Sequence, residues 1–228
     1  MGQTPTTLVI ATESGLAASL TARLRDRGDQ VLATHPAMDL TDATAVGEEL
    51  RRLSVGGEVD RVVLAAIAPS AFRSTPITAL SEAEWDQAGE WTMRAAFVSL
   101  QQAHAVLADG GRVILILPTV ATTGVAGLVP LCSAIEAVRV MAKAVARRWG
   151  ARSITVNTIE VDLAAFLVGD EGGDGVDVPN VPVLGQPALP AGSVIDDVVG
   201  LLDMLASPAA GAITGALLVA DRGTVMQP

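Results

Sequence analysis

Short apolar runs alternate along the chain with segments whose apolar residues recur at helical spacing. Residues 7–11 (TLVIA) form an apolar run that is too short for a helix, and this predicts a buried strand. Leu16, Leu20 and Leu24 then recur every four residues on one face of a helix, which Gly28 ends. The chain is therefore expected to begin with a strand followed by a helix.

The same alternation continues to the carboxyl terminus. Ser81 and Glu84 have the spacing of a capping box that opens a long helix, and Pro130 stands where helices accept proline. Strands that are apolar throughout are typical of a parallel sheet covered on both faces. We therefore expect a single domain over residues 1–228, an α/β fold with one doubly wound, Rossmann-like parallel sheet in three α/β/α layers. The further strands are expected at residues 29–34, 59–68, 112–117, 153–159 and 216–220, and the further helices at residues 42–53, 81–107, 130–148 and 193–205.

Two segments have no apolar periodicity. Residues 109–111 (DGG) predict a turn between a helix and the next strand. Residues 169–192 are rich in Gly, Pro and Asp, and they lie between the last two strand–helix units. This longer segment is interpreted either as a mobile lid within the domain or as a disordered surface loop.

Composition narrows the classes of protein. The net charge of −10 repels nucleic acid and anionic membrane surfaces, so neither is an expected partner. No apolar run reaches the roughly 18 residues that span a bilayer, and we expect a soluble cytoplasmic protein. A single Cys excludes a disulfide framework. The two His are far apart in the sequence, so we expect no metal site.

The order of segments resembles the short-chain dehydrogenase/reductase family over nearly the whole chain. The match is best in the second half, from the segment that corresponds to the family's active-site helix to a C-terminal signature. This resemblance implies the Rossmann-like fold. The matching segments are residues 84–86 (EWD), 137–139 (AVR), 143–146 (KAVA), 153–159 (SITVNTI), 205–208 (LASP), 213–215 (ITG) and 221–223 (DRG).

The family's chemistry uses a Tyr, a Lys, a Ser and an Asn. The resemblance places Leu131 at the Tyr position, Ile135 at the Lys position, Pro118 at the Ser position and Thr92 at the Asn position. The chain contains no Tyr, so no shift of the alignment restores the family's proton donor. The single lysine, Lys143, lies about 80° round the helix and ~12 Å along it from Ile135, and we expect it at the surface or in an interface. Hydrocarbon side chains do not transfer protons, so no catalytic residue is expected.

The family's glycine-rich cofactor turn corresponds to residues 10–17 (IATESGLA), which keep only Gly15 of its three glycines. Glu13 adds a carboxylate beside the place of a pyrophosphate, which is unfavourable. Residues 39–42 (DLTD) are similar to the family's adenine-contacting segment. We expect no cofactor, with weak binding of NAD(P) or an adenine nucleotide as the alternative. The vestigial cofactor positions are Thr12, Gly15, Leu16, Asp39, Leu40 and Ala66.

Four other residues are candidates for chemistry. Glu136 and Glu160 flank the former active site, where apolar neighbours raise a carboxyl pKa. Spacing favours an outward, solvated Glu136. Cys132 is next to the Tyr position, but it has no His nearby in sequence, and we expect it to be buried and inert. His104 lies on the long helix as a satisfied surface or interface residue.

In the family, the helices that correspond to residues 81–107 and 130–148 form a four-helix dimer interface. All three Trp of the chain lie on these helices or at their ends, and Trp, Met and Phe are enriched in interfaces. We expect these helices to pair with a second copy, with a related active dehydrogenase subunit, or with both. The expected interface residues are Trp85, Trp91, Phe97, Met141, Val145 and Trp149.

The resemblance therefore leads to two functional predictions. The first is a catalytically degenerate member of the family that is not itself an enzyme and acts as a structural or regulatory subunit. The alternative is an atypical NAD(P)-dependent short-chain oxidoreductase, or a ligand-binding protein, that uses the former cofactor and substrate cleft.

Overall fold

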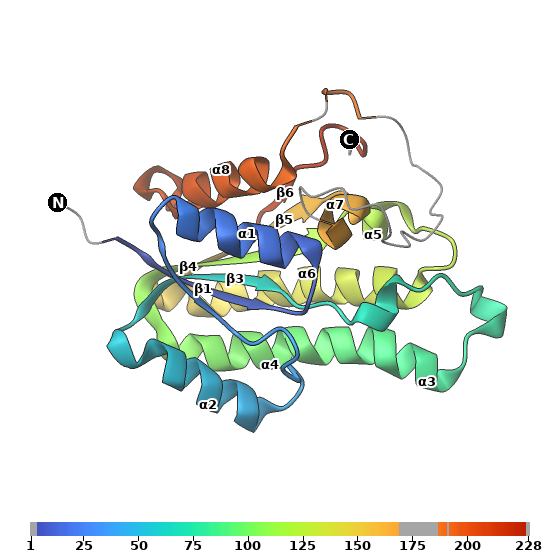
Figure 1. The fold of residues 1–228 in the computed structure, drawn as a ribbon, viewed down its shortest axis with the longest axis horizontal. Helices are drawn as coiled ribbons and strands as arrows, with labels where there is room; N and C mark the ends of the chain where they lie inside the picture. Colours follow the sequence, from blue (N-terminus) through green and yellow to red (C-terminus); the bar gives the residue numbers. More distant parts are fainter. Residues whose placement is uncertain (1–3, 169–186, 191, 227–228) are drawn as a thin grey trace.

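A computed structural model describes residues 4–168, 187–190 and 192–226. Its six parallel strands form one sheet in the order β2-β1-β3-β4-β5-β6, which confirms the predicted doubly wound sheet (Figure 1). Most of the segment 169–192, predicted as a lid, lies outside the described residues. The strands are β1 (Thr6–Ala11), β2 (Gln30–Ala33), β3 (Val59–Ala65), β4 (Leu107–Pro118), β5 (Thr155–Val161) and β6 (Leu217–Val219).

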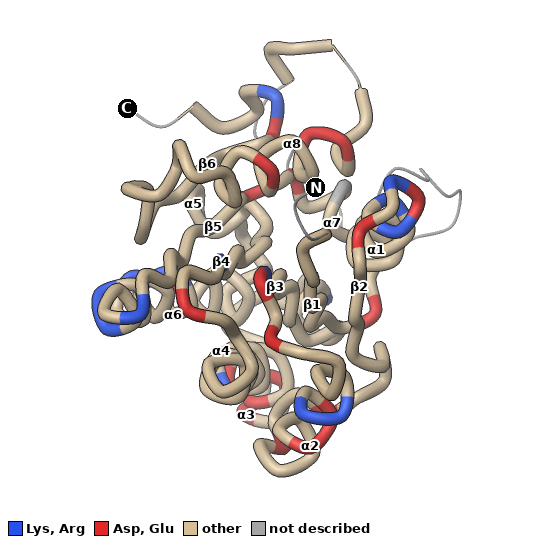
Figure 2. The backbone as a smooth tube through the Cα atoms, turned by 90° about the vertical axis from the view of Figure 1, so that its left-hand side faces the viewer, with Lys and Arg blue, Asp and Glu red and all other residues tan. Residues whose placement is uncertain are grey.

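Helices cover both faces of the sheet. Figures 1 and 2 show α1 and α8 on one side and α2, α4 and α6 on the other, which gives the expected three layers. No helix among the described residues is long and apolar enough to cross a membrane. The helices are α1 (Gly15–Asp26), α2 (Ala43–Leu53), α3 (Glu82–Trp85), α4 (Trp91–Val106), α5 (Val120–Thr123), α6 (Val129–Trp149), α7 (Leu163–Val168) and α8 (Val194–Ala206).

The core is built from the predicted apolar positions. Leu16, Leu20 and Leu24 of α1 are each at most 1% exposed and pack on the sheet. Every residue of β5 is buried, as expected for a central strand covered on both faces. Ser81 and Glu84 form the predicted capping box. Local signals and tertiary packing therefore agree over most of the chain.

The predicted helix over residues 81–107 is interrupted. A π-helical turn, Asp86–Glu90, separates α3 from α4. The Thr92 hydroxyl donates to the carbonyl of Ala88 (2.6 Å) and accepts from the amide of Ala68 (3.0 Å), so this side chain fixes the turn to the segment after β3. The atoms nearest to a side chain at Gly89 would belong to Pro130 of α6 and to Trp85, so the turn lies close to α6. A π turn inside a helix is often found at a functional site.

The predicted turn at residues 109–111 is part of β4 instead. Between the pairs Val59–Leu107 and Arg61–Arg112, β4 contains three more residues than β3, so these residues bulge out of the ladder. Gly110 has φ +77°, a left-handed conformation that glycine adopts without strain. The Gly residues therefore permit a bulge at the start of the strand rather than a turn before it.

β6 depends on one buried amide side chain. Asn157 of β5 is 1% exposed. Its Nδ2 donates to the carbonyl of Ile213 (2.9 Å), and its Oδ1 accepts from the amide of Ala216 (3.0 Å). Asn157 thus fixes the chain segment that leads into β6.

Replacing this amide should destabilise the protein. Asn157→Ala leaves the Ile213 carbonyl and the Ala216 amide without these partners, and we expect the free energy of unfolding to fall by about 2 kcal/mol. Urea denaturation measures the loss. Ser133→Ala, on the exposed face of α6, is the matched control and should change stability by less than about 0.5 kcal/mol. Equal effects of the two substitutions would contradict this role of Asn157.

Candidate functional site

The carboxyl ends of the parallel strands meet at one edge of the sheet. The strand order reverses between β1 and β3, and ligands of open α/β sheets bind in the crevice at such a switch point. Thr12, directly after β1, is buried there. Its hydroxyl donates to the carbonyl of Ile67 (2.8 Å) and accepts from the Ile67 amide (3.3 Å). Thr12 therefore fixes the turn after β1 to the segment after β3.

The amino terminus of α1 opens at this edge. Ser14 is the N-cap: its hydroxyl accepts from the amide of Ala17 and its carbonyl from the amide of Ala18, both at 3.1 Å. The amides of Gly15 and Leu16 are the remaining donors of the first turn, which has no intrahelical acceptors for them. Such a turn, at the positive end of the helix dipole, is suited to bind a phosphate group. Glu13 is exposed beside it.

The predicted adenine end lies beyond β2. Asp39 is exposed, and its carboxylate accepts from the hydroxyl (2.7 Å) and the amide (2.9 Å) of Thr41. These hydrogen bonds hold the pKa of Asp39 below its usual value, with smaller contributions from Trp91 and Arg94 of α4. The carboxylate of Asp39 is thus already engaged in its own turn.

Three further predicted cofactor positions are buried, besides Thr12. The side chains of Leu16 and Leu40 are fully buried, and Ala66 is 5% exposed. The two leucine side chains belong to the hydrophobic core, so these residues contact a ligand only through their backbone. The sequence pattern located the right turns but did not separate backbone positions from core side chains.

The family's four catalytic positions also lie near this edge. Leu131 and Ile135 are fully buried on α6, and Pro118 ends β4. Thr92 is fully buried and serves the π turn described above. Thr119, directly after Pro118, donates its amide to the carbonyl of Val161 (2.9 Å). None of the apolar side chains at these positions transfers a proton.

A polar cluster, formed by Thr122, Glu136, Arg139 and Glu160, lies at the same end of the sheet. Nε of Arg139 is 3.2 Å from Oε1 of Glu160, and the Arg139 guanidinium also donates to Glu136. The Thr122 hydroxyl lies 3.4 Å from Oε2 of Glu160 and 3.5 Å from Nη1 of Arg139. Three elements, α5, α6 and β5, each contribute to this cluster.

Burial distinguishes the two carboxyl groups of the cluster. Glu160 is 0% exposed, whereas the Glu136 side chain is 51% exposed and points outward as predicted. Burial raises the pKa of Glu160 to about 7, although the charge of Arg139 and the Thr122 hydroxyl oppose the shift. Its Oε1 atom has no hydrogen-bond partner in the part of the chain that the structure describes. Glu160 is thus a buried acid that is partly protonated at neutral pH.

Sequence reasoning identified Glu136 and Glu160 but missed Thr122 and Arg139. A charged residue inside the fully buried strand β5 was a usable signal, because a buried carboxylate needs a partner. The Glu136–Arg139 spacing of i, i+3 on α6 was a second signal. Neither signal places Thr122 beside them, since this depends on how α5 packs on α6.

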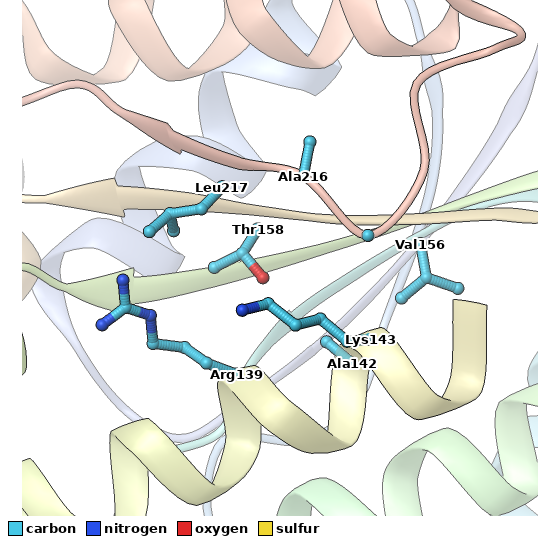
Figure 3. A pocket seen from close by; sticks show the side chains of 8 residues that line it. Arg139, Ala142, Lys143, Val156, Thr158, Ala216 and Leu217 are labelled. Carbon is cyan, nitrogen blue, oxygen red and sulfur yellow. The ribbon is translucent and has the colours of Figure 1, made fainter. Parts of the chain in front are cut away.

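Lys143 lies one helical turn after Arg139. Figure 3 shows both side chains projecting from α6 toward β5, where they line a small pocket with Thr158, Ala216 and Leu217. Lys143 is exposed, as the sequence predicted. It is separated from the Ile135 position and does not replace the family's lysine.

The remaining candidates have structural explanations. Cys132 is half-buried, and burial raises the pKa of its thiol, which fits the predicted inert residue. The ring of His104 packs on Trp149 with centroids 4.8 Å apart, and burial lowers the pKa of His104. Within the described ranges, no three His, Cys, Asp or Glu side chains are placed to hold a metal ion.

Trp149, one of the predicted interface residues, has little exposed surface in the single chain. Trp149 is only 9% exposed and is part of the hydrophobic core, because the last turn of α6 brings it against His104 of α4. By contrast, the Phe97 ring on α4 is 51% exposed. Trp91, Met93, Phe97 and Met141 line a groove across α4 and α6.

Comparison with known proteins decides the family. Residues 7–225 match the family described as enoyl-(acyl carrier protein) reductase. The chain belongs to the short-chain dehydrogenases/reductases. D-threitol dehydrogenase of Mycolicibacterium smegmatis is 28% identical over 191 residues, which cover 82% of this chain and 71% of that protein.

Solved structures agree on the fold. A variant of a Serratia marcescens short-chain dehydrogenase/reductase has a TM-score of 0.77 at 25% identity, with 97% of this chain and 98% of that chain covered. A Burkholderia cenocepacia short-chain dehydrogenase in complex with NADP has a TM-score of 0.78 at 24% identity, with the same coverage.

These relatives correct the first functional prediction. The named relatives that this chain resembles over most of its length are a dehydrogenase and a dehydrogenase/reductase, so the interpretation as a non-catalytic subunit is wrong. They favour the alternative prediction, an oxidoreductase that depends on NAD(P).

The buried acid makes stability depend on pH. Because the pKa of Glu160 rises to about 7 on folding, its protonated form is favoured in the folded state. The stabilisation is complete below the unfolded pKa of 4.5 and is lost as the pH rises through about 7, by at most about 3 kcal/mol.

Glu160→Gln cannot ionise, and we expect it to lose this part of the pH dependence. The free energy of unfolding, measured in urea from about pH 5 to about pH 8, should fall less steeply than in the wild type. Glu82→Gln, at an exposed position of α3, is the control and should keep the wild-type slope. A wild-type slope in Glu160→Gln would show that another group titrates.

Proposed function

We propose that the chain is an atypical NAD(P)-dependent short-chain oxidoreductase that uses the cleft at the carboxyl ends of β1, β3, β4 and β5. The observation that carries the proposal is the open first turn of α1 at the switch point, where the amides of Gly15 and Leu16 remain for a pyrophosphate. The similarity to named dehydrogenases and reductases supports it.

The residues present fit a dinucleotide at its pyrophosphate end. Ser14 and Gly15 leave small groups at the helix start, and no cation is needed where helix amides bind a phosphate. Ala11 and Ala17, which replace two glycines of the family's turn, are both buried at 8% exposure. The exposed Glu13 weakens binding by charge repulsion, so we propose a modest affinity. When bound, the nicotinamide accepts or supplies a hydride.

Titration with NADH and NADPH, followed by calorimetry or Trp fluorescence, tests the cofactor. Turnover assays with polyols, including D-threitol, and with the matching carbonyl compounds then test the reaction class. Saturable binding together with oxidation or reduction of a probe is the expected result. Lack of saturable binding of either cofactor would overturn the proposal.

Charge at the α1 cap should control this affinity. Ser14→Asp keeps a good N-cap but adds a negative charge beside the pyrophosphate, so we expect NADPH binding to weaken about tenfold. Glu13→Gln removes a charge and should tighten binding several-fold. Gln101→Glu, on an exposed position of α4, is the control and should leave the dissociation constant unchanged. Equal effects of Ser14→Asp and Gln101→Glu would place the dinucleotide elsewhere.

We also propose that the chain forms a homodimer through the helices at residues 81–107 and 130–148. Phe97 (51% exposed) and Val140 (62% exposed) are large apolar side chains on the outer surface of these helices. Phe97 also lines the groove with Trp91, Met93 and Met141, and exposed apolar patches of this kind mark association sites. Of the predicted interface residues, Trp85, Trp91, Phe97, Met141 and Val145 remain in this proposal.

A charge in this surface should separate the subunits. Phe97→Asp buries an unpaired carboxylate in the dimer, and we expect light scattering after size exclusion to give the monomer mass at micromolar concentration. Val55→Asp, at an equally apolar but distant position that is 84% exposed, is the control and should remain a dimer. A wild type that is monomeric throughout would refute the interface.

A further inference from the structure

We propose that Thr122, Arg139 and Glu160 form a proton relay in which Thr122 exchanges a proton with the substrate oxygen and Glu160 stores it. Thr122 is then the catalytic hydroxyl, Glu160 a positioning and proton-storing residue, and Arg139 the cation that sets the charge around them. The inference rests on the proposed function, because the relay needs hydride transfer to a carbonyl compound or from an alcohol.

The hydrogen bonding of Glu160 is unusual for a buried carboxyl group. A fully buried carboxyl group normally has complete hydrogen bonding. Here Oε1 is ion-paired with Nε of Arg139 at 3.2 Å but makes no hydrogen bond of regular geometry among the described residues, and Oε2 accepts a long bond (3.4 Å) from Thr122. An ion pair that served only to fix α6 to β5 would be expected to have better geometry. An incompletely satisfied buried acid is typical of a functional group.

Glu160, Thr122 and Arg139 lie close in the fold to the family's catalytic positions. In the register of the sheet, Glu160 lies beside Leu117 of β4 and directly precedes Val161, the partner of Pro118. Thr122 follows Pro118 by four residues on α5, and Arg139 follows Ile135 by one helical turn on α6. Thr122 therefore lies one turn after Thr119, the residue next to Pro118, and Arg139 lies one helical turn after Ile135.

The Thr122 hydroxyl has the acid–base partner that proton transfer requires. An aliphatic hydroxyl does not ionise at neutral pH, so it moves a proton only when a base is next to it. Glu160 is shielded from solvent and lies within hydrogen-bond distance of Thr122, whose side chain is only partly buried, so in this proposal a proton leaves Glu160 through Thr122. Arg139, 3.2 Å from Glu160, stabilises the carboxylate that forms when the proton leaves.

The step balances in the direction of carbonyl reduction. A reduced nicotinamide dinucleotide supplies the hydride that forms the new C–H bond. The O–H bond of Thr122 breaks as its proton passes to the carbonyl oxygen, and the carboxyl proton of Glu160 passes to the Thr122 oxygen. Glu160 is left as a carboxylate beside Arg139 until a solvent proton restores it. Alcohol oxidation runs through the same transfers in reverse.

Other charged groups act on the same carboxyl. Glu136 on α6 and Asp221 after β6 both raise the pKa of Glu160, and Arg139 lowers it. The Asp221 carboxylate accepts from the amides of Gly223 (2.9 Å) and Val225 (2.7 Å) and belongs to the carboxyl-terminal turn. Of the three carboxyl groups, Glu160 is the one that is fully buried and within hydrogen-bond distance of Thr122 among the described residues.

The test compares Glu160→Gln, Thr122→Val and Thr122→Ser with the control Thr123→Val, which changes the adjacent, exposed hydroxyl. Two quantities are measured: the pH profile of turnover with NADP⁺ and D-threitol, or the best substrate found above, and the titration of the Glu160 carboxyl by ¹³C NMR in the protein without cofactor. Thermal unfolding of each variant shows that it is folded.

We expect Glu160→Gln and Thr122→Val to lower kcat about 100-fold and to remove the limb of the profile near neutral pH, with NADPH affinity unchanged. Thr122→Ser should restore the rate and the limb, and Thr123→Val should resemble the wild type. In the NMR titration, Thr122→Val should shift the Glu160 resonance and its midpoint, because the two groups share a proton.

The outcomes separate this inference from the proposed function. Lack of cofactor binding in the wild type overturns both. Turnover with an unchanged pH profile in Glu160→Gln overturns the relay alone. Cofactor binding without turnover of any probe, or a Glu160 midpoint at the ordinary value for Glu, also overturns the relay and leaves the dinucleotide site standing.

Discussion

The structure depends on the burial of β3, β4 and β5 on both faces. Most residues of these strands are buried on both sides of the sheet, so helices must cover both faces, and strands joined through helices run parallel. Parallel strands end at the same edge, and this brings the turn after β1, the segment after β3 and the end of β4 together. The candidate site is a direct consequence of this arrangement.

A buried sheet makes each polar residue within it costly, so the polar residues at this edge are informative. Thr12 and Asn157 satisfy their hydrogen bonds with nearby backbone groups and act as structural ties. Glu160 does not, since one of its oxygens lacks a hydrogen-bond partner within the described residues. Among the buried side-chain atoms of the described residues that lack such a partner, Glu160 supplies the one carboxyl oxygen, and it is the residue for which we propose chemistry.

In this family a tyrosine usually transfers the proton, and this chain contains no tyrosine. Without the tyrosine, that proton donor is missing. The strand order still brings the carboxyl ends of the strands together at the switch point, beside the amino terminus of α1. General acid–base chemistry needs a group of suitable pKa within reach of the reacting oxygen, and several residue types meet that need. The similarity to a named dehydrogenase and the raised pKa of Glu160 in β5 both fit the proposed oxidoreductase.

The sequence by itself determined the order of strands and helices, the parallel sheet and the missing tyrosine and lysine, because apolar periodicity and residue identity are local properties. It also located the capping box of Ser81 and Glu84, whose hydrogen bonds lie within one turn. Only the tertiary structure decided that Trp149 is in the core and that Thr122, Arg139 and Glu160 meet. These contacts join residues far apart in the chain, and their geometry depends on the packing of α5 and α6 against the sheet.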